Sequence, residues 1–516
     1  MEKIIILDFG SQYTHLIARR IRELKVYSEI LPFNVSINKI KSGDVKGIIL
    51  SGGPDSVYQP NAPKPSKKVE EWILAGKIPV LGICYGFQLL AYMLGGNVEK
   101  GIRGEYGRAE IKVLEENDLF KGLPQKQVVW MSHGDIVAEL PPKALALAKS
   151  KDGLVAAFKL GKLYGVQFHP EVKHTVCGRE ILRNFLFEVC KCEGLWDIGD
   201  IVNRVVEDIR KEASSGNVLM AVSGGVDSTT SACLIKMALG VDRIYLVVID
   251  TGFLRENEAE KAVRLYEKLG FKHIFLVDVK EKFISRLKGV VDPEEKRRLI
   301  SQLYFEVLDE KADELAKEYG EFKYLGQGTI YPDRVESGAT GRATARIKSH
   351  HNVVYTHLSK LVKLEPLKDL YKDEVRKIAE LIGVPKEVIF KHPFPGPGLA
   401  IRIIGEVTEE KLKILRKVDK IVEEELRKAG IYKMLWQAFP VLLPIKTVGV
   451  MGDERTYRYA IALRAVISED AMTAEFAKLP WNLLERLSSR IVNEIKNVNR
   501  VLYDITNKPP ATIEYE

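Results

Sequence analysis

Short apolar runs alternate with amphipathic stretches along the first three quarters of the chain. KIIIL, GIIL, PVLGI and YGVQFH occur before residue 170, and NVLMAV, RIYLVVID, HIFLVD and KYLG occur between residues 217 and 326. These runs are rich in β-branched residues, and helical patterns separate them. Strands that alternate with helices predict parallel sheets with helical crossover connections.

The pattern changes at HPFPGPGLAIR, which begins at His392. Its prolines and glycines indicate a break, after which a long amphipathic helix is predicted near 408–429, followed by β-rich and helical segments. The chain is therefore predicted to be an α/β protein with two doubly wound parallel-sheet domains, at 1–192 and 195–391, and a C-terminal α+β domain at 392–516.

Composition supports a globular protein. Apolar residues make up 46% of the 516 residues and charged residues 29%, and no run approaches the length of about 20 apolar residues that a membrane span needs. The start, MEKIIILDFG, goes directly into a strand pattern without a secretory signal, so a cytoplasmic location and no membrane partner are expected.

Charge and cysteine content narrow the class further. A net charge of +8 is mild for this length; it suits small anionic substrates and gives no reason to expect nucleic acid as a partner. Five scattered cysteines argue against a disulfide framework. Cys190 and Cys192 have no second pair at a spacing typical of zinc.

One cysteine stands at a corner between a strand and a helix. The segment Gly82-Ile83-Cys84-Tyr85-Gly86 follows the apolar run PVLGI and leads into a helical pattern. Glycines on both sides of Cys84 allow a sharp turn that presents the sulfur at a helix N-terminus, where the dipole favours thiolate. The same five residues also fit a small core side chain at a tight turn.

A thiolate nucleophile needs a base and a group that orients the base. In GVQFHPEV, Pro170 biases His169 toward extended structure, so His169 and Glu171 point to the same side of the segment. Upstream, LSGGPDS begins at Leu50 and can expose the N–H of Gly53, to act with the N–H of Tyr85 as an oxyanion hole. An ordinary β-turn is the alternative for this loop.

SGGP, GICYGFQLLA and QFHPE, in this order, resemble the class I glutamine amidotransferases over about residues 1–190. The resemblance implies that Cys84 attacks the amide of glutamine, that His169 transfers the proton and that Glu171 orients His169. It also implies that Gln88 and the segment MSHGD, with Ser132 and His133, line the glutamine pocket.

A second loop, in NVLMAVSGGVDSTTSACLI, lies between a predicted strand and a predicted helix. Backbone N–H groups, two hydroxyls and a helix N-terminus can cradle an anion here, but the lysine of a P-loop is missing, so bound pyrophosphate fits better than terminal phosphoryl transfer. Asp227 can hold Mg²⁺ or cap the helix. The loop residues are Ser223, Gly224, Gly225, Val226, Asp227 and Ser228.

The SGGVDS motif resembles the ATP pyrophosphatase family, which cleaves ATP between its α- and β-phosphates and adenylates a substrate. This implies that adenine lies near Val248–Asp250 and near Gly326–Thr329. The small polar residues between Ser337 and Arg346 predict a lid over the phosphates. Lys348, His350 and His351 follow it and can reach phosphate oxygens, although a solvated turn fits the histidines as well.

The C-terminal motifs HPFPGPGLAIR, GVMGDERTY and KPPATIEYE resemble the GMP synthase family, which extends the resemblance to the whole chain. The implied acceptor is xanthosine 5′-monophosphate (XMP), adenylated at O2 and aminated at C2 to GMP, with AMP and pyrophosphate released. The third domain would also form a homodimer. Glutamine, ATP with Mg²⁺ and XMP are the expected small-molecule ligands.

Four residues are candidates for the XMP site. Lys508 can meet the 5′-phosphate and Glu514 can accept from the purine N–H groups. The resemblance adds Asp453 and Arg297, with Arg298 as a neighbouring alternative to Arg297. Tyr515 stands where the family usually has Trp.

Other functions remain open at this stage. Another amide ligase or a tRNA-thiolating enzyme can carry the SGGVDS loop, and a regulatory protein that only senses glutamine and nucleotides can retain both loops. A thiolating enzyme needs a cysteine near the adenylating site, and Cys233 has the pattern of a buried helix residue. The presence of Cys84, His169, Glu171 and Asp227 together argues against a regulatory protein.

Overall fold

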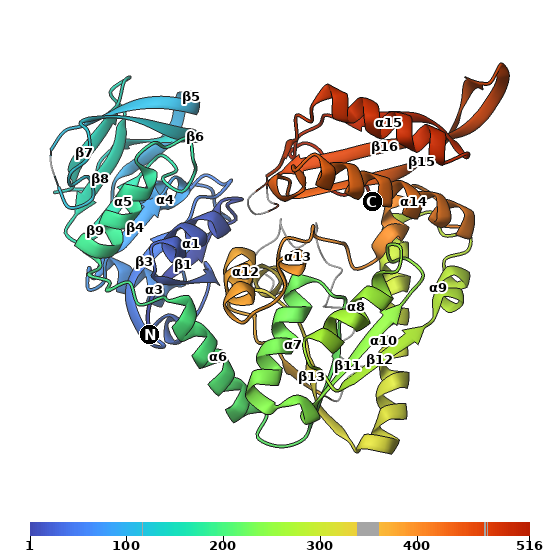
Figure 1. Ribbon diagram of the computed structural model, residues 1–516. Coiled ribbons are helices and arrows are strands. Elements are labelled where there is room, and N and C mark those ends of the chain that lie inside the picture. The colour runs from blue at the N-terminus through green and yellow to red at the C-terminus, as the bar shows by residue number, and fades with distance from the viewer. Residues whose placement is uncertain (116, 338–360, 469–470, 472) are drawn as a thin grey trace. The chain divides into compact units, whose positions relative to one another are not determined.

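The structure is a computed structural model that describes residues 1–516 except 116, 338–360, 469–470 and 472 (Figure 1). The chain divides into two compact units, one built mainly from Met1–Asp200 and the other mainly from Ile201–Arg334 and the C-terminal segment. None of the helices in the described part of the chain is long and apolar enough to cross a membrane.

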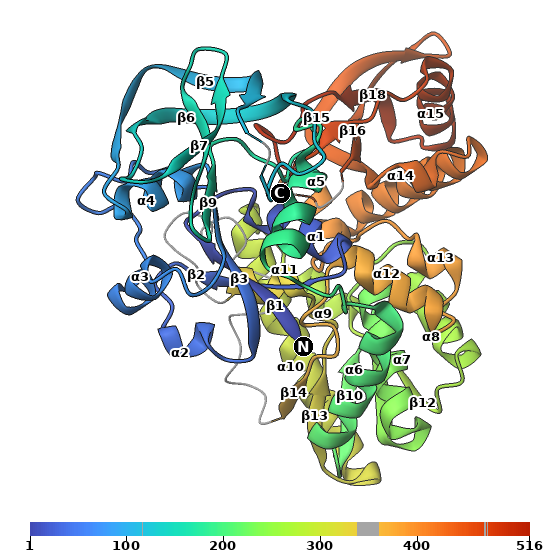
Figure 2. The ribbon, with the colours of Figure 1, turned by 90° about the vertical axis from the view of Figure 1, so that its left-hand side faces the viewer.

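A nine-stranded sheet in the order β2-β1-β3-β4-β9-β8-β7-β5-β6 forms the first unit (Figure 2). The neighbours β2, β1, β3, β4 and β9 pair in parallel, as predicted, and the pairs from β9 onward in this order are antiparallel. The antiparallel half was not expected; it arises because short hairpin turns join β7 to β8 and β8 to β9, and such turns allow only antiparallel pairing. The strands are β1 (Glu2–Asp8), β2 (Tyr27–Pro32), β3 (Asp44–Leu50), β4 (Val80–Ile83), β5 (Asn97–Val113), β6 (Lys126–Glu139), β7 (Leu145–Ser150), β8 (Val155–Leu160) and β9 (Leu163–Val166).

Helices cover both faces of the parallel part of this sheet. Ile4, Ile5, Ile6 and Leu7 are all fully buried, although neighbouring strand residues point to opposite faces. Such continuous apolar runs are typical of parallel strands covered on both sides. The helices are α1 (Thr14–Glu23), α2 (Ile37–Ile40), α3 (Lys67–Leu74), α4 (Tyr85–Met93), α5 (Gly178–Asn184) with the π-helical turn η1 (Phe185–Val189), and α6 (Ile198–Glu212), which runs into the second unit.

The second unit contains a five-stranded, fully parallel sheet in the order β12-β11-β10-β13-β14. Strand β11, next to the central strand β10, is buried along its whole length, which confirms the second predicted α/β sheet. The elements are β10 (Asn217–Ala221), α7 (Val226–Leu239), η2 (Val241–Arg243), β11 (Ile244–Asp250), α8 (Glu258–Lys268), β12 (His273–Asp278), α9 (Lys280–Arg286), α10 (Pro293–Tyr319), β13 (Phe322–Gly326), α11 (Tyr331–Ser337), β14 (Val362–Leu364), α12 (Lys372–Leu381) and α13 (Lys386–Ile389).

The C-terminal segment adds a smaller sheet, in which β16 pairs antiparallel with β15 and β17 and parallel with β18, and helices α14 and α15 lie along it (Figure 1). The long helix predicted near 408–429 is α14. One apolar core, which contains Val247, Leu415 and Ile461, joins this sheet to the five-stranded one. The elements are η3 (Gly398–Arg402), α14 (Glu409–Lys428), η4 (Tyr432–Met434), β15 (Gln437–Met451), β16 (Glu454–Ile467), β17 (Glu475–Phe476), α15 (Trp481–Glu494) and β18 (Val498–Asp504).

The predicted domain boundary at 391–392 falls in the loop between α13 and η3, and the described residues on both sides of it belong to the same compact unit. The described chain therefore has three sheets in two compact units.

Candidate active sites

The first site is built around Cys84, at the corner between β4 and α4. Its backbone has φ 54° and ψ −105°, a conformation that L-residues with a Cβ rarely adopt and that is typical of nucleophiles held on a sharp turn. The Cys84 N–H donates to the Val166 carbonyl at 2.9 Å, which fixes the corner to β9. The side chain is 5% exposed, and its Sγ lies 3.6 Å from the Ser132 carbonyl oxygen.

The two glycines of this corner are required by close backbone contacts. A Cβ on Gly82 would lie 2.3 Å from the Gly86 carbonyl oxygen, and a Cβ on Gly86 would lie 2.3 Å from the Leu50 carbonyl oxygen. The Gly86 N–H also donates to the Ser51 carbonyl at 3.0 Å. The corner therefore packs directly on the end of β3, which the sequence suggested only as a need for sharp turning.

His169 and Glu171 are brought together as expected. Nδ1 of His169 lies 2.7 Å from Oε1 of Glu171, and both side chains are almost fully buried. The backbone of His169 is held at both ends, because its N–H donates to the Trp130 carbonyl and its carbonyl accepts from the Thr175 hydroxyl at 2.6 Å. The carboxylate therefore orients an imidazole whose backbone is fixed.

The electrostatics of His169 favour its protonated form. Burial acts to lower the pKa of His169, but the charge of Glu171, the charge of Cys84 and hydrogen bonds with both side chains outweigh burial and raise the pKa well above its ordinary value. An imidazolium beside a thiolate is the arrangement that both activates a cysteine nucleophile and supplies a proton to a leaving amine.

The N–H groups of Tyr85 and Gly53 are the candidates for the oxyanion hole at this corner. Tyr85 is the first residue of α4, so its N–H has no intrahelical acceptor. Gly53 lies against it, since a Cβ on Gly53 would be 3.3 Å from Cγ of Tyr85. Neither N–H makes a backbone hydrogen bond within the described residues. Both groups can therefore donate to a developing oxyanion.

The predicted glutamine-pocket residues form one hydrogen-bonded group. Nε2 of Gln88 donates to the Asp135 carbonyl at 2.9 Å, and Nδ1 of His133 lies 2.9 Å from the same oxygen. Nε2 of His133 lies 3.0 Å from Oε2 of Glu105, whose pKa is lowered by its hydrogen bond with His133 despite partial burial. Gln88 and His133 thus share the Asp135 carbonyl, and Ser132 meets Cys84 through its own carbonyl oxygen.

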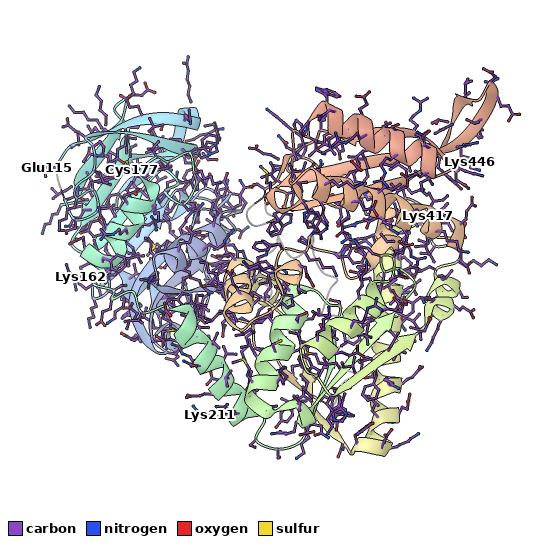
Figure 3. All side chains as sticks on the ribbon, in the orientation of Figure 1. Glu115, Lys162, Cys177, Lys211, Lys417 and Lys446 are labelled. Atoms are coloured by element: carbon purple, nitrogen blue, oxygen red, sulfur yellow. The ribbon has the colours of Figure 1, made fainter. Side chains whose placement is uncertain are left out.

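The other cysteines do not resemble Cys84. Burial raises the pKa of Cys190 and Cys192, and it raises the pKa of Cys233 to about 11. Cys177 lies at the start of α5 (Figure 3), and burial raises its pKa as well. In the residues that the structure describes, no three His, Cys, Asp or Glu side chains gather as a metal site.

The second site is a cavity of about 510 Å³ within the second unit. The loop between β10 and α7 forms one wall, with Ser223, Gly225, Val226, Asp227 and Ser228 among its lining residues. Gly224 has φ +69°, and a Cβ there would lie 3.2 Å from Cβ of Ala262, so glycine suits this position. Ser223 and Ser228 approach each other at 3.3 Å between their hydroxyl oxygens, which closes the loop.

The predicted adenine-binding segments line the same cavity. Val248 and Ile249, at the end of β11, contribute from one side, and Gly326–Thr329 contribute from the end of β13. These strand ends lie on either side of β10, so the cavity lies at the carboxyl edge of a parallel sheet, where α/β proteins bind nucleotides.

The two carboxylate oxygens of Asp227 differ in their partners. Oδ2 forms an ion pair with Nζ of Lys372, from the first turn of α12, whereas Oδ1 is buried without a hydrogen-bond partner among the described residues. A buried acceptor without a partner fits a cation ligand. Lys372 also lines the cavity.

Arg297, on α10, lines the cavity and also contacts the end of the chain. Its Nη2 donates to the backbone oxygen of Glu516, while neighbouring Lys296 forms a buried ion pair with the Glu516 side chain. Arg298 instead pairs with Glu295 at 2.7 Å on the exposed side of α10. The geometry therefore favours Arg297 over Arg298 as a residue that meets a ligand.

Glu514 and Lys508 lie in the same C-terminal tail but have different partners. The Arg402 guanidinium donates to both carboxylate oxygens of Glu514, at 2.9 and 3.1 Å, and Gln437 donates to Oε1 at 2.7 Å. Nζ of Lys508 donates to the Ala471 carbonyl at 2.7 Å.

Asp453 lies apart from the other three XMP candidates. It occupies the turn of the β15–β16 hairpin, where Gly452 and Asp453 both have positive φ, as in a type I′ turn. The hairpin projects from the C-terminal sheet (Figure 1), and Lys446, labelled in Figure 3, resumes the strand pairing after a bulge. The structure thus gives Asp453 a turn-forming role and no contact with Arg297, Lys508 or Glu514 among the described residues.

The predicted lid and the residues that follow it, Lys348, His350 and His351, lie outside the described residues.

Three side chains that sequence reasoning missed are Lys372, Arg402 and Gln437. Each meets a predicted site residue from a distant part of the chain. No local motif signals such a meeting, apart from the position of Lys372 at the start of a helix.

Comparison with known proteins agrees with this division of chemistry. A class I glutamine amidotransferase model matches residues 5–189, an NAD synthase model matches 198–299, and a GMP synthase C-terminal domain model matches 424–515. A crystal structure of a putative GMP synthase subunit from Thermoplasma acidophilum is a neighbour at 34% identity, with a TM-score of 0.33, and the match covers 37% of this chain and 94% of that one.

Full-length relatives give the more specific result. The GMP synthase [glutamine-hydrolyzing] of Symbiobacterium thermophilum is 50% identical over 518 residues, and the match covers 99% of each chain. The corresponding protein of Aquifex aeolicus is 50% identical over 516 residues, again with 99% of each chain covered.

The fold and the two sites thus define a glutamine-dependent carbon–nitrogen ligase, in which an amidotransferase is joined to an ATP-using domain. End-to-end identity decides among the ligases, and it does not favour a thiolating enzyme or a regulatory protein. The chain belongs to the glutamine-hydrolysing GMP synthase family.

Proposed function

We propose that this protein converts XMP to GMP with nitrogen from glutamine and with ATP cleaved to AMP and pyrophosphate. The observation that carries the proposal is the ordered Cys84–His169–Glu171 site in one chain with a pyrophosphate-type loop that lines a 510 Å³ cavity. Each of the two reactions, production of ammonia and activation of its acceptor, thereby has its own set of residues.

The glutaminase reaction uses groups of the first unit only. Sγ of Cys84 attacks the carboxamide carbon of glutamine, and the N–H groups of Gly53 and Tyr85 stabilise the oxyanion. His169, protonated beside Glu171, gives its proton to the departing nitrogen, and ammonia leaves a thioester on Cys84. Neutral His169 then takes a proton from water, whose oxygen attacks the thioester and releases glutamate.

The activating reaction uses the second unit. The loop Ser223–Ser228 holds the β- and γ-phosphates by backbone N–H groups and hydroxyls, as the helix N-terminus of α7 favours anions. The O2 oxygen of XMP attacks the α-phosphorus of ATP, and pyrophosphate leaves. Ammonia then adds to C2 of the purine, and AMP departs with the oxygen.

Mg²⁺ is the cofactor that the Asp227 carboxylate would hold, through the buried Oδ1 that has no hydrogen-bond partner among the described residues. The ion would supply neutralisation of the pyrophosphate charge. Lys372, which now pairs with Asp227, lies in the cavity and adds a further positive charge for the phosphates.

For XMP, we propose Arg297, Lys508 and Glu514 as binding residues. Arg297 already contacts the tail that carries Glu514, and the Glu514 carboxylate is held by Arg402 and Gln437 in a fixed orientation. Asp453 makes no contact with these residues in the described part of the chain, and we propose it as a further XMP residue on the resemblance alone.

A homodimer through the C-terminal sheet is also proposed. Val448 and Tyr457 are directly opposite on β15 and β16, and both are exposed, as is Val450 on the same face. An exposed apolar sheet face of this kind is typical of an interaction surface. Sedimentation of the wild-type protein and of Tyr457→Asp tests this, and a wild-type monomer at micromolar concentration would contradict it.

The expected cytoplasmic location stays a prediction.

The proposed reaction is tested by following products together. Purified protein with XMP, ATP, Mg²⁺ and glutamine is expected to give GMP, AMP, pyrophosphate and glutamate in equal amounts, whereas inosine monophosphate or a nicotinate nucleotide should not replace XMP. Glutamate release without GMP formation under these conditions would contradict the proposal.

A further inference from the structure

Tyr13 is an aromatic side chain at the first site that belongs to none of the catalytic motifs. Its ring forms an edge-type contact with the His169 imidazole, with ring centroids 5.0 Å apart and planes at 69°. Tyr13 lies in the turn between β1 and α1, far from His169 in the sequence. Motif analysis therefore could not connect the two residues.

The turn that carries Tyr13 is held by its own hydrogen bonds. Oδ1 of Asp8 accepts from the Gly10 N–H at 3.0 Å and from the Thr14 hydroxyl at 2.7 Å. Oγ of Ser11 accepts from the Tyr13 N–H at 3.0 Å. These contacts fix the backbone of the turn that carries the ring without help from the catalytic residues, so Tyr13 can act as a support for His169.

The imidazole is confined on another side by Gly52. A Cβ added to Gly52 would lie 3.3 Å from Cε1 of His169 and 3.2 Å from Oγ of Ser11. The bond from Nδ1 to Glu171 leaves the ring free to swing about that contact. Contacts at Gly52 and Tyr13 restrict this swing, and only a restricted ring keeps Nε2 directed at the sulfur.

We propose that Tyr13 is a positioning residue of the glutaminase site, whose ring holds the His169 imidazole in the orientation that serves Cys84. The role rests on the proposed glutaminase function. An edge-type aromatic contact also suits an imidazolium, because the negative face of one ring attracts the positive edge of the other. The phenol hydroxyl makes no hydrogen bond among the described residues, so the ring alone performs the role.

The test compares Tyr13→Leu with Tyr13→Phe in the full-length protein. Tyr13→Leu is expected to lower kcat for glutamine hydrolysis about tenfold, the size of effect that the loss of one aromatic pair gives, with KM for glutamine unchanged. Tyr13→Phe keeps the ring and should retain wild-type kcat. GMP synthesis from ammonium salts should be the same in both variants, since it does not use His169.

Tyr92→Leu serves as a matched control, because Tyr92 is a partly exposed tyrosine on α4 without a contact to His169 among the described residues. The proposal is overturned if Tyr13→Leu keeps the wild-type kcat or changes only the KM for glutamine. It is overturned as well if the kcat of Tyr13→Leu is no lower than that of Tyr92→Leu. An equal loss of kcat in Tyr13→Phe and Tyr13→Leu would also overturn it. A wild-type protein without any glutaminase activity would instead refute the proposed function itself.

Discussion

The two sites occupy the same kind of corner, from a parallel strand to a helix, but they are prepared in opposite ways. At Cys84 the backbone is in a rare conformation, the neighbouring glycines touch carbonyl oxygens, and the reacting side chains are buried. At Ser223–Ser228 the loop lines a 510 Å³ cavity, and Asp227 pairs with Lys372.

The difference follows from the chemistry that each corner serves. A covalent nucleophile acts at one atom and needs fixed geometry around that atom before glutamine arrives. A nucleotide site must accept several negative charges, so its cationic and anionic side chains pair with each other until the ligand replaces one partner. The first corner is therefore complete in the protein alone, and the second becomes complete only with its ligand.

The largest expected effect comes from Cys84→Ala. Without the sulfur no thioester forms, so glutamine-dependent GMP synthesis should fall by at least about 10³-fold. Synthesis from ammonium salts should remain, because the described residues that line the second cavity all belong to the second unit. Cys177→Ala is the matched control and should leave both reactions unchanged. Loss of the ammonium-dependent reaction in a folded Cys84→Ala protein would mean that the sites are not separable.

Asp227→Asn should produce the complementary result. The amide keeps the size of the side chain but removes the charge that binds the cation, so AMP formation should fall about 10²-fold or more with either nitrogen source. Glutamine hydrolysis measured alone should continue. Asp242→Asn, at an exposed ion pair with Lys272, is the control. Normal pyrophosphate release by Asp227→Asn would remove Asp227 from the phosphate site.

Much of this contrast could be predicted from local sequence. The Cys84 corner, His169 with Glu171, and the loop Ser223–Ser228 are each short segments whose residues set their own geometry, so motif and pattern were sufficient. The strands β1, β3, β4 and β11 were also predictable, because buried parallel strands are continuous apolar runs.

Contacts between distant segments were not predictable in this way. Lys372 reaches Asp227 across 145 positions, and Arg402 reaches Glu514 across 112. The antiparallel half of the first sheet begins with β5, whose charged and glycine-rich sequence has no apolar run. The hairpin turn at Gly452 and Asp453, both with positive φ, was likewise not predicted, and the ligand contact proposed for Asp453 stays a prediction.

Gly86→Ala tests whether the first corner depends on its close packing. The new Cβ would meet the Leu50 carbonyl oxygen at 2.3 Å, and backbone cannot yield as a side chain can. Overpacking of this kind costs about 3 kcal/mol, which should appear as a lower free energy of unfolding of the first unit in urea. Gly199→Ala, whose Cβ would meet only the flexible Asp197 side chain at 3.3 Å, is the control. Equal stability of the two variants would contradict the packing described here.

The smallest expected effect is on the pH dependence of stability, which should have opposite signs in the two units because each contains a buried histidine. His169 has a raised pKa, so the stability it contributes to the first unit is fully present below its unfolded pKa and is lost as pH rises through the folded value. His392 is the reverse case: burial lowers its pKa to about 4, and its ring stacks on Tyr432 at 3.8 Å between centroids.

Neutral His392 accepts from the Ala438 N–H through Nδ1 and donates to the Tyr432 carbonyl through Nε2. Its contribution is therefore present above the unfolded pKa of about 6.5 and is lost as pH falls toward 4. Between pH 7 and pH 5 the free energy of unfolding of the second unit should fall by about 2 kcal/mol on this account. Urea unfolding of wild type and His392→Gln at both pH values measures it, and the variant should lose this part of the pH dependence. If His392→Gln kept the wild-type pH dependence, other groups would cause the loss of stability at low pH. The two buried histidines would then not have opposite effects on the pH dependence of stability.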